Sequence, residues 1–432
     1  MRLCSTTLVA PRIAHHQSPA QPVPGSEKQL VGHRVLQPLE HWLRQMHRLP
    51  AHGNRGLFAD HLLVAHLVAF LSPALKSLRR IEEVFNHPAV RKRFGLPRVP
   101  RSTLSDAQAV FDPTRLDAIV ADLRARVPVL PHEPALDALL KTLTAVDGSF
   151  FALAPRVTWA LYNKPKADTA PPTGSTRTKS DARRKGNIRV DVHFNVLTGV
   201  PEQAILTDGR TPEYQTLVEH LLPGRFYVLD RAYHCYQMMA DILTAGSDFL
   251  ARLRSDMQFE VVEDHVLSAA DRLAGVISVR TVRVCGWRGR HVLGSTPLKL
   301  VCIGLPEGTQ LRLLTNRVDL DAALIGLLYR YRWQIELFFR WLKCLVNFRH
   351  FFSESPEGVA LQIGAAVIGT LLIALTIQDR PSSYDWAMIT HVMNGLLPLD
   401  EETFRIMATR RAERARAAAW QKAYRARQKQ AR

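Results

Sequence analysis

The sequence predicts an α/β fold, and three features of the 432-residue chain indicate it. Up to about residue 134 the apolar residues recur at helical spacing, as in Leu57–Arg80. Beyond that point, short β-branched segments typical of strands alternate with helical ones. A long and mostly apolar helix is then expected at Asp321–Leu345. Strands that alternate with helices usually form a sheet that is covered by helices.

These changes of pattern divide the chain into six segments. They are a flexible arm (1–50), a helical domain (51–134), the first part of an α/β core (135–253), a β-rich insertion (254–316), the second part of the core (317–400) and a basic C-terminal helix (401–432). The arm is expected because Gln17–Glu27 is rich in Pro, Gln and Ser. Within the insertion, alternation of apolar and polar residues predicts strands at Phe259–Val262, Val276–Val284, Arg290–Leu293 and Leu298–Ile303.

The composition indicates a globular protein with a polyanionic partner. Apolar residues make up 47% of the chain, and the net charge is +18. Such a charge favours the phosphates of DNA or RNA, although a basic protein that binds no nucleic acid is the alternative. The five cysteines form no CxxC or Cys/His cluster, so they imply neither a disulfide framework nor a zinc site. We expect a reducing cytoplasm, and the N-terminus does not resemble a signal peptide.

One segment raises the question of a membrane. Gly358–Gln378 carries no charge and is about long enough to span a bilayer. It also contains Gln362, Thr370 and Thr376, and no second segment of this kind accompanies it. We therefore expect a buried helix beside Asp321–Leu345, and no membrane partner.

The helix expected at Asp321–Leu345 carries a stripe of polar side chains. At roughly 100° per residue, four of them fall within an arc of about 60°: Tyr329, Arg332, Glu336 and Lys343. A helix that is apolar on its other sides should be buried, and buried charges need partners. One acid between two bases indicates an anionic ligand, with a metal ion as a further candidate.

Two aspartates follow apolar strands elsewhere in the core. Asp147 comes after Leu143–Val146, and Asp230 comes after Phe226–Leu229. Carboxylates at the carboxyl ends of neighbouring strands lie where α/β sheets usually bind ligands. A divalent cation relieves their repulsion, and Mg²⁺ prefers carboxylate oxygens, water and phosphate. With Glu336 the two aspartates would form a three-carboxylate centre suited to two-metal phosphoryl transfer.

Each of these acids also has an ordinary structural explanation. An aspartate at a strand end is commonly a turn former or a helix cap. Glu336 could simply pair with Arg332 or Arg340, each four residues away on the same helix. That pairing would leave both aspartates unexplained, so we favour the metal centre.

The spacing of the polar stripe resembles that of a known family. Its four residues reproduce the Y-x2-R-x3-E-x6-K signature of the insertion sequence four family of DDE transposases. VDGS at 146–149 is similar to the first motif of that family, and LDRAYH at 229–234 to the second. The third region is matched by TN at 315–316 and by YRYRWQIELFFRWLK at 329–343. The resemblance covers about Leu143 to Phe352.

The resemblance implies an RNase-H-like catalytic core with a divalent metal. Asp147, Asp230 and Glu336 would be the triad that binds Mg²⁺, with Mn²⁺ as its substitute. The resemblance also places a β-rich insertion between the second Asp and the Glu. Family members with that insertion cut DNA through a hairpin intermediate at the transposon end.

The remaining residues of the stripe would bind DNA by the same resemblance. Tyr329, Arg332 and Lys343 would hold phosphates near the cut end. Trp333, next to the Arg, is a candidate for stacking on a displaced base, with packing in the core as its alternative.

The implied function is cut-and-paste transposition, in which 3′ ends are cleaved and the freed hydroxyl attacks target DNA. The resemblance further implies double-stranded DNA as the partner, a homodimer on that DNA, and a place at the nucleoid of a bacterial cytoplasm. The alternatives are a nuclease that cuts without joining, and a catalytically silent DNA-binding protein. The sequence does not choose among the N-terminal helices, the basic loop Lys164–Arg189 and the tail Arg405–Arg432 for recognition of the ends.

Overall fold

The computed structural model describes most of the chain, in several stretches. The described residues are 33–48, 57–72, 74–94, 98–130, 132–153, 157, 160, 186–233, 235–254, 257–285, 287–305, 308–344, 351–379, 381–394, 396–398 and 400–430. Gln17–Glu27, most of the loop Lys164–Arg189, and His234 of the second motif lie outside the described residues.

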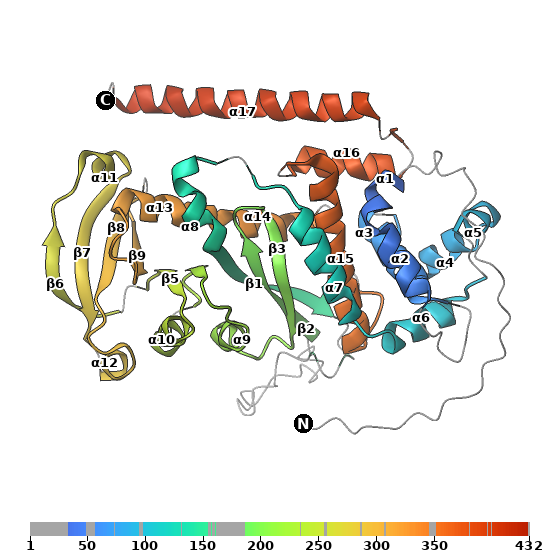
Figure 1. The fold of residues 1–432 in the computed structure, drawn as a ribbon, viewed down its shortest axis with the longest axis horizontal. Coiled ribbons are helices and arrows are strands. Elements are labelled where there is room, and N and C mark those ends of the chain that lie inside the picture. The colour runs from blue at the N-terminus through green and yellow to red at the C-terminus, as the bar shows by residue number, and fades with distance from the viewer. Residues whose placement is uncertain are drawn as a thin grey trace, which may run out of the picture.

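The described residues form one mixed sheet of nine strands, in the order β3-β2-β1-β4-β5-β9-β8-β7-β6. The strands are β1 (Leu143–Leu153), β2 (Gly186–Asn195), β3 (Val200–Thr207), β4 (Phe226–Leu229), β5 (Asp248–Arg252), β6 (Phe259–His265), β7 (Val276–Val284), β8 (Leu298–Gly304) and β9 (Gln310–Thr315). β1, β4 and β5 are parallel neighbours, and all other neighbouring pairs are antiparallel. The sheet is therefore mixed, with a parallel centre (Figure 1).

The β-rich segment between the second aspartate and the glutamate extends this same sheet. β9 pairs with β5, with Thr315 opposite Leu250, and β8, β7 and β6 follow outward from it. Three of the four strands expected here are present. The fourth prediction, a strand at Arg290–Leu293, is wrong, because these residues belong to helix α12 (Trp287–Leu293). A Cβ at Gly289 would lie 2.0 Å from Cγ1 of Val284, so glycine allows this helix to pack directly on β7.

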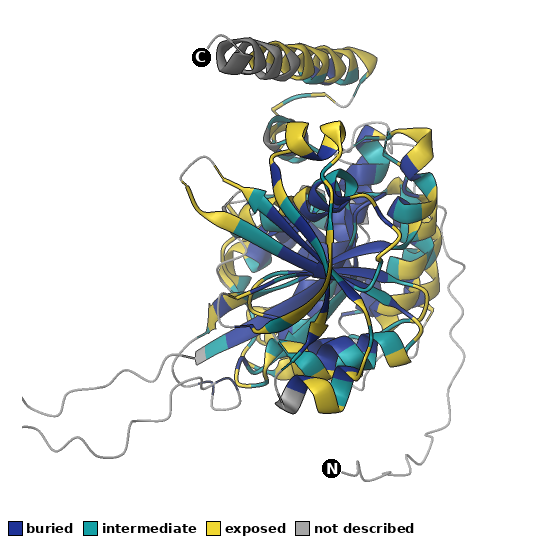
Figure 2. Cartoon of the chain, turned by 90° about the vertical axis from the view of Figure 1, so that its left-hand side faces the viewer, coloured by how far each residue is buried: buried dark blue, intermediate teal, exposed yellow. Residues whose placement is uncertain are grey.

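Two helices lie on either side of β4 along the chain. They are α9 (Glu213–Glu219), before β4, and α10 (Tyr236–Thr244), between β4 and β5. Figure 2 shows a buried sheet centre with partly exposed helices on both sides, whereas strand residues toward the edges are more exposed, as β6 is. Tyr227 and Phe249, on neighbouring strands, are fully buried. The centre of the sheet is thus covered on both faces.

Short helices make up the N-terminal part of the described chain. They are α1 (His33–Leu36), η2 (Gln37–Leu39), α2 (Glu40–His47), α3 (Ala59–Leu71), α4 (Leu78–Phe85), α5 (Pro88–Phe94), α6 (Arg101–Val110), α7 (Arg115–Arg126), η3 (Pro134–Leu136) and α8 (Asp137–Thr142). The flexible arm expected over 1–50 is wrong for residues 33–48, which are helical. Val35 and Leu39 are fully buried there, because their spacing forms an apolar face that the polar composition of Gln17–Glu27 does not share.

Helix α15 (Pro356–Ile377) is the central helix of the N-terminal side. The Ser355 side chain caps it by accepting a hydrogen bond from the Gly358 backbone. Among the described helices it alone has the length and apolar composition that crossing a bilayer would need, and most of it is buried inside the protein. It packs on α3, α6, α7 and β3, with Phe70 of α3 against Gly369. The buried helix expected at Gly358–Gln378 is therefore present.

The prediction of a single helix at Asp321–Leu345 is wrong in one respect, because two helices occupy this range. They are α13 (Ala322–Tyr331) and α14 (Trp333–Cys344), and Arg332 lies between them. The Arg332 amide bonds to the carbonyl of Tyr329, and the Arg332 carbonyl accepts from the amide of Ile335. Both hydrogen bonds span three residues, so the backbone tightens to a 3₁₀-like turn there, as often happens at functional positions.

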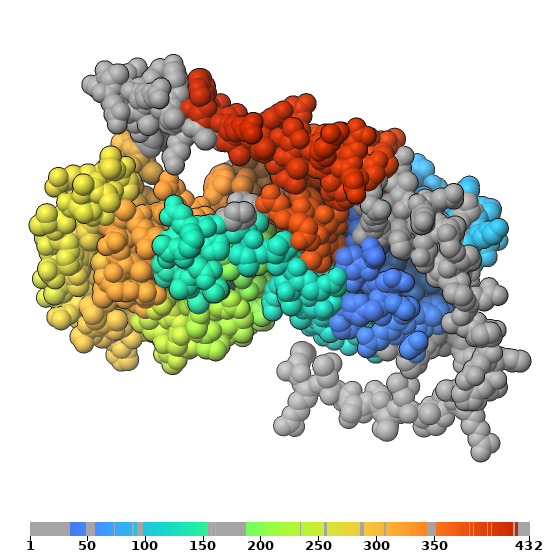
Figure 3. Space-filling model, turned by 45° about the horizontal axis from the view of Figure 1, so that its top comes forward, coloured from blue at the N-terminus to red at the C-terminus, as the bar shows by residue number. Residues whose placement is uncertain are grey.

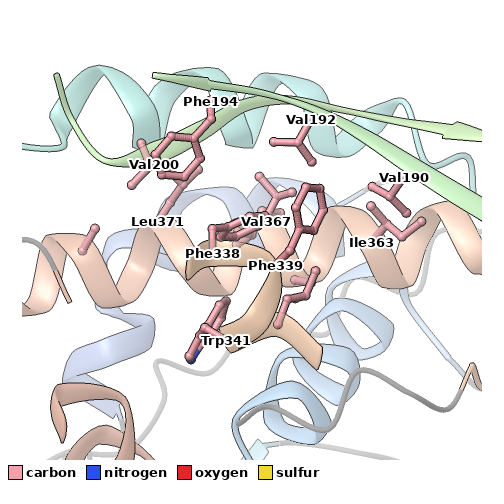
Figure 4. Close-up of a cluster of buried hydrophobic side chains, with 14 of the residues drawn as sticks. Val190, Val192, Phe194, Val200, Phe338, Phe339, Trp341, Ile363, Val367 and Leu371 are labelled. Atoms are coloured by element: carbon pink, nitrogen blue, oxygen red, sulfur yellow. The ribbon is translucent and has the colours of Figure 1, made fainter. Parts of the chain in front are cut away.

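Aromatic side chains fix α14 against its surroundings. Phe338 and Phe339 lie between strand residues such as Phe194 and the α15 helix (Figure 4). The rings of Phe194 and Phe338 are 5.8 Å apart, and Trp341 stacks on Trp386 of α16 (Ser383–Met393) at 3.5 Å. The apolar side of α14 is thus held in the core, and its polar side is left facing the sheet edge.

The last helix, α17 (Glu401–Gln430), lies in the range where we predicted a basic helix. Met407 is fully buried, and Arg411 contacts Asp385 at 3.0 Å and Asp379 at 3.5 Å. Beyond these contacts most described residues of the helix are exposed. Figure 3 shows it running over the surface of the molecule.

Candidate active site

The parallel pairing of β1 and β4 brings two of the predicted acids together. Val146 of β1 lies opposite Leu229 of β4. Asp147 and Asp230 are the next residues along both strands, so they continue the same register. The expectation that their strands are neighbours is confirmed, and the two carboxylates lie at one edge of the parallel centre.

The sequence predicted that Asp147 follows the end of its strand, and this prediction is wrong. β1 continues to Leu153 because it pairs with β2 on its other side, where Asp147 lies opposite Val192. What ends after Val146 is the pairing with β4. The Asp147 side chain is therefore held on a strand with one paired edge, and its Oδ1 accepts a hydrogen bond from the Gly148 amide at 2.9 Å.

Arg332 links the third acid to these two. Its Nη2 donates to Oε1 of Glu336, so the helix-internal ion pair weighed as an alternative is present. The same guanidinium also interacts with the two aspartates. Its positive charge lowers the pKa of Asp147, and the negative charge of Asp230 raises the pKa of Arg332. Burial alone opposes the charge of Arg332, yet Tyr329, Asp230 and Glu336 together raise its pKa. One buried cation thus interacts with all three carboxylates.

Tyr329 and Arg252 contact the second aspartate directly. The Tyr329 hydroxyl donates to Oδ1 of Asp230 at 3.2 Å, and Nη1 of Arg252 lies 3.9 Å from the same oxygen. Burial raises the pKa of Tyr329 to about 12, so the phenol stays a hydrogen-bond donor at neutral pH. Arg252 is on β5, and the sequence alone gave no reason to include it.

The pKa of Asp147 shows how strongly the site disfavours negative charge without a bound cation. The pKa of this carboxyl is raised to about 7, chiefly by burial and also by the charges of Glu213 and Asp230, while Arg332 and the Gly148 amide act in the opposite direction. Carboxylates that resist ionisation for this reason gain from a divalent cation, which cancels their repulsion.

The three acids do not form a compact group of ligand atoms. Among the described residues, only His47, Asp60 and His61 place three ligand atoms within 4.8 Å of one another. The three acids of the site are therefore further apart. All the donor atoms are carboxylate oxygens, which fits Mg²⁺ or Mn²⁺.

A second group of charged residues lies on β2, the neighbour of β1, and was not predicted from the sequence. Arg189 and Asp191 of β2 form a buried ion pair with Nε–Oδ1 at 2.8 Å. Arg189 also donates to the Thr211 carbonyl and to Oγ1 of Thr216 at 3.1 Å, which fixes the start of α9 and with it Glu213. Only the β1–β2 register reveals this group, and the sequence does not give that register.

Gly148 lies where this group and the strand approach most closely. A Cβ at this position would lie 2.7 Å from Oδ1 of Asp191, 2.9 Å from Cδ of Arg189 and 3.0 Å from Oε1 of Glu213. All three neighbours are held by other bonds or by burial. The glycine of the VDGS motif is therefore required by space.

Lys343 and Trp333 stand at the border of the site. Nζ of Lys343 lies 5.0 Å from the centre of the Phe151 ring, on β1 beyond the aspartate. Trp333 is 49% exposed, and the Arg340 guanidinium lies 5.8 Å from the centre of its ring. The core position weighed for Trp333 is thus wrong, because its place in the first turn of α14 points it to solvent while Phe338 and Phe339 fill the core.

Comparisons with known proteins show which proteins this chain is similar to. Residues 139–372, more than half of the chain, match the family model described as transposase DDE domain. A candidate transposase of Sinorhizobium fredii, y4zB, is 30% identical over 201 residues, which cover 46% of this chain and 55% of that protein. A Geobacillus stearothermophilus protein, named as a transposase for insertion sequence element IS5377, is 24% identical over 329 residues, 73% of this chain and 79% of that protein. The chain thus spans about half the length of the first relative.

One solved structure is also similar in part. A piggyBac transposase in a synaptic complex with hairpin DNA aligns over 88% of this chain and 79% of that chain. The sequence identity is 10% and the TM-score is 0.35, a value too low to support an inference about this chain.

Proposed function

The chain belongs to the transposase DDE domain family, and from this premise we propose that it catalyses cut-and-paste transposition of an insertion sequence. The reaction would be metal-dependent cleavage at the DNA ends, followed by attack of the freed 3′ hydroxyl on target DNA. We propose the same site residues as the sequence predicts. Asp147, Asp230 and Glu336 would bind the metal and carry out catalysis, and Tyr329, Arg332, Lys343 and Trp333 would bind DNA.

One observation carries the proposal above all others. Asp147 and Asp230 continue one parallel register, and a single buried guanidinium, that of Arg332, interacts with both of them and with Glu336. A helix-internal ion pair would explain the link to Glu336 alone. The convergence of acids from β1, β4 and α14 on one cation is what a phosphoryl-transfer site needs.

The metal we propose is Mg²⁺, which Mn²⁺ could replace. Bound there, it would activate the attacking oxygen and stabilise the leaving oxygen of an in-line displacement. Asp147, Asp230 and Glu336 would supply the oxygens that hold it. Tyr329 and Arg252 keep the Asp230 carboxylate in place, and the Gly148 amide orients that of Asp147.

The basic residues of the site would bind the phosphates of the DNA end. Lys343 reaches the β1 side of the site above Phe151, where a phosphate flanking the acids could be bound. The ring of Trp333 is 49% exposed, and we propose that it stacks on a base that leaves the duplex. This arrangement, with the β6–β9 insertion, supports cleavage through a hairpin intermediate.

The finer assignment is to the insertion sequence four family with an RNase-H-like core. The resemblance of the three motifs supports it, together with the mixed sheet that places the two aspartates on adjacent parallel strands. The segment limits expected from the sequence stay part of this proposal, with the insertion at 254–316 and the glutamate-bearing helix in 317–400.

The partners follow from the charge and from the kind of organism in which the relatives occur. A net charge of +18 supports double-stranded DNA as the partner, and α17 exposes several arginines on its described part. We propose a homodimer on the DNA, because two ends must be joined in one event. Both named relatives are bacterial, which supports a place at the nucleoid of a bacterial cytoplasm.

The test is an assay that separates cutting from joining. Purified full-length protein is incubated with Mg²⁺, a target plasmid and DNA ends taken from the sequence that flanks the gene. We expect cleaved ends, hairpin ends on a denaturing gel, and joined products. Asp147→Ala, Asp230→Ala and Glu336→Gln should abolish cleavage and retain DNA binding, whereas Glu260→Gln on exposed β6 should stay active.

Three outcomes would change the proposal in distinct ways. Cleavage without joined products would identify a nuclease that does not transfer strands. A cleaving triad variant would overturn the metal assignment. Binding without any cleavage by the unaltered chain would indicate a silent DNA-binding protein.

A further inference from the structure

A second cluster of metal-ligating side chains lies on the N-terminal helices, away from the sheet (Figure 1). His47 is the last residue of α2, and Asp60 and His61 lie in the first turn of α3. One ligand atom of each lies within 4.8 Å of the other two, and no other three such residues in the described part of the chain are so close. We propose that these three residues form a zinc site.

The distances are close to those that a bound zinc ion would impose. Nδ1 of His47 lies 3.1 Å from Oδ2 of Asp60, and Nε2 of His61 lies 3.7 Å from the same oxygen. Tetrahedral zinc with bonds of about 2.0–2.1 Å keeps its ligand atoms roughly 3.3 Å apart. The ligand atoms of the two histidines lie within 4.8 Å of each other, so the two rings would move closer together on binding. Three protein ligands leave the fourth position to water, on the side where His47 is half exposed.

Burial argues for a ligand at this place. The His61 side chain is 8% exposed and that of Asp60 13%. Oδ2 of Asp60 and Nε2 of His61, the atoms that face each other, therefore lie where little water reaches them. A carboxylate in such a place is costly unless a cation or a hydrogen-bond donor pairs with it.

An ordinary ion pair explains only part of the cluster. Positive charge on His47 is favoured at the C-terminus of α2, and negative charge on Asp60 is favoured at the N-terminus of α3. That pair does not account for the buried His61, whose Nε2 faces the same oxygen of Asp60. A divalent cation accounts for all three side chains. Two imidazoles and one carboxylate are also a ligand set that zinc accepts without cysteine.

The site would fasten the first helices to the rest of the protein. It joins the end of α2 to the start of α3, and α3 packs along α15. Phe70, near the other end of α3, contacts the ring of Trp341 of α14 at 5.5 Å. Zinc would thus hold residues 33–48 on the same body that carries the acids, and its removal should lower the melting temperature of the protein.

The test is Co²⁺ binding by the full-length protein in excess Mg²⁺, which occupies sites made only of carboxylates. Imidazole-bound Co²⁺ absorbs visible light, and we expect one equivalent to bind and to be displaced by Zn²⁺. His47→Gln changes a half-exposed side chain and should fold, yet lower the Co²⁺ affinity at least about tenfold. His61→Gln should do the same. The matched control is His41→Gln, since His41 is on the same helix and pairs with Asp122 at 3.6 Å, outside the cluster.

The outcomes decide the matter in either direction. Loss of the signal in His47→Gln, with the signal kept in His41→Gln and in Glu336→Gln, supports the zinc site. Absence of a signal from the unaltered chain overturns it. A signal that survives in His47→Gln but vanishes in Glu336→Gln also overturns it, because the metal then binds at the acids of the sheet.

Discussion

The hydroxyl of Tyr329 donates a hydrogen bond to Oδ1 of Asp230 at 3.2 Å, across 99 positions of sequence. A residue in the last turn of α13 thereby orients a carboxylate that follows β4, a strand of the parallel centre. Tyr329 thus belongs to the polar stripe of the signature and also contacts one of the acids. Its phenol can hold that acid before any DNA binds.

We expect Tyr329→Phe to slow DNA cleavage about tenfold and to leave the fold intact. The ring is buried and stays in place, so only the hydrogen bond to Asp230 is lost, worth about 1 kcal/mol. Cleavage rates measured over a range of Mg²⁺ concentrations should show a weaker apparent metal affinity. Tyr331→Phe, two residues on in the same helix, is the control. Equal rates for Tyr329→Phe and the unaltered protein would remove the positioning role.

Asp147→Asn should make the metal-free protein more stable above neutral pH. The carboxyl has a folded-state pKa of about 7, above its ordinary value near 4, so its favourable neutral form is lost as pH rises through 7. Asparagine cannot ionise and avoids this loss, which we put at about 2 kcal/mol because the group is only partly buried. Melting temperatures should differ at pH 8 and converge near pH 4.

Added Mg²⁺ should reverse that order. It should stabilise the unaltered protein at pH 8 and have little effect on Asp147→Asn, because the substitution removes a ligand. If the two proteins melt together at every pH without metal, Asp147 is not held in a site that disfavours its charge.

Gly148→Ala should impair both folding and metal binding. The added carbon would meet Asp191, Arg189 and Glu213 at 3.0 Å or less, and these side chains are held by one another or by burial. We expect a loss of stability of about 1–3 kcal/mol, typical of overpacking, with a lower apparent Mg²⁺ affinity. Urea denaturation and Mg²⁺ titration measure the two effects. Ser149→Ala, on the next residue of the strand, should change neither, and a neutral Gly148→Ala would contradict the close approach.

Trp333→Ala should weaken DNA processing without weakening the fold. The ring is 49% exposed, so its removal should cost less than about 0.5 kcal/mol of stability. Loss of stacking on a displaced base is worth about 1–3 kcal/mol, so formation of hairpin ends should slow by roughly 5- to 150-fold. Trp420→Ala, which removes another exposed tryptophan from α17, is the control. Slowing of both variants to the same degree would point to general loss of DNA affinity.

The sequence singled out the three acids because each follows a local pattern. Asp147 and Asp230 come after short apolar runs, although β1 continues past Asp147, and Glu336 falls on a helical stripe. The sequence did not predict Arg252, Glu213 or the supporting pair on β2. Their roles depend on which strands are neighbours and in which register, and pairing of distant strands leaves no local trace.

The errors have the same physical origin. The break at Arg332 is absent from the pattern because Tyr329 to Lys343 contains no Gly or Pro, and only the backbone hydrogen bonds reveal it. Residues 33–48 were assigned to an arm because their neighbours are polar, whereas Val35 and Leu39 pack into the protein. Four alternating residues at Arg290–Leu293 were too few to distinguish a strand from a helix.

Asn316 offers a different view of the β6–β9 insertion. Its Oδ1 accepts from the Phe249 amide at 2.9 Å, and its Nδ2 donates to Oδ1 of Asp248 at 2.6 Å. The chain therefore leaves the core after β5 and returns along β9, and Asn316 holds its point of return against β5. From that point the chain continues to α13 and then to Glu336. Asn316 thus anchors the end of the insertion to the first two residues of β5.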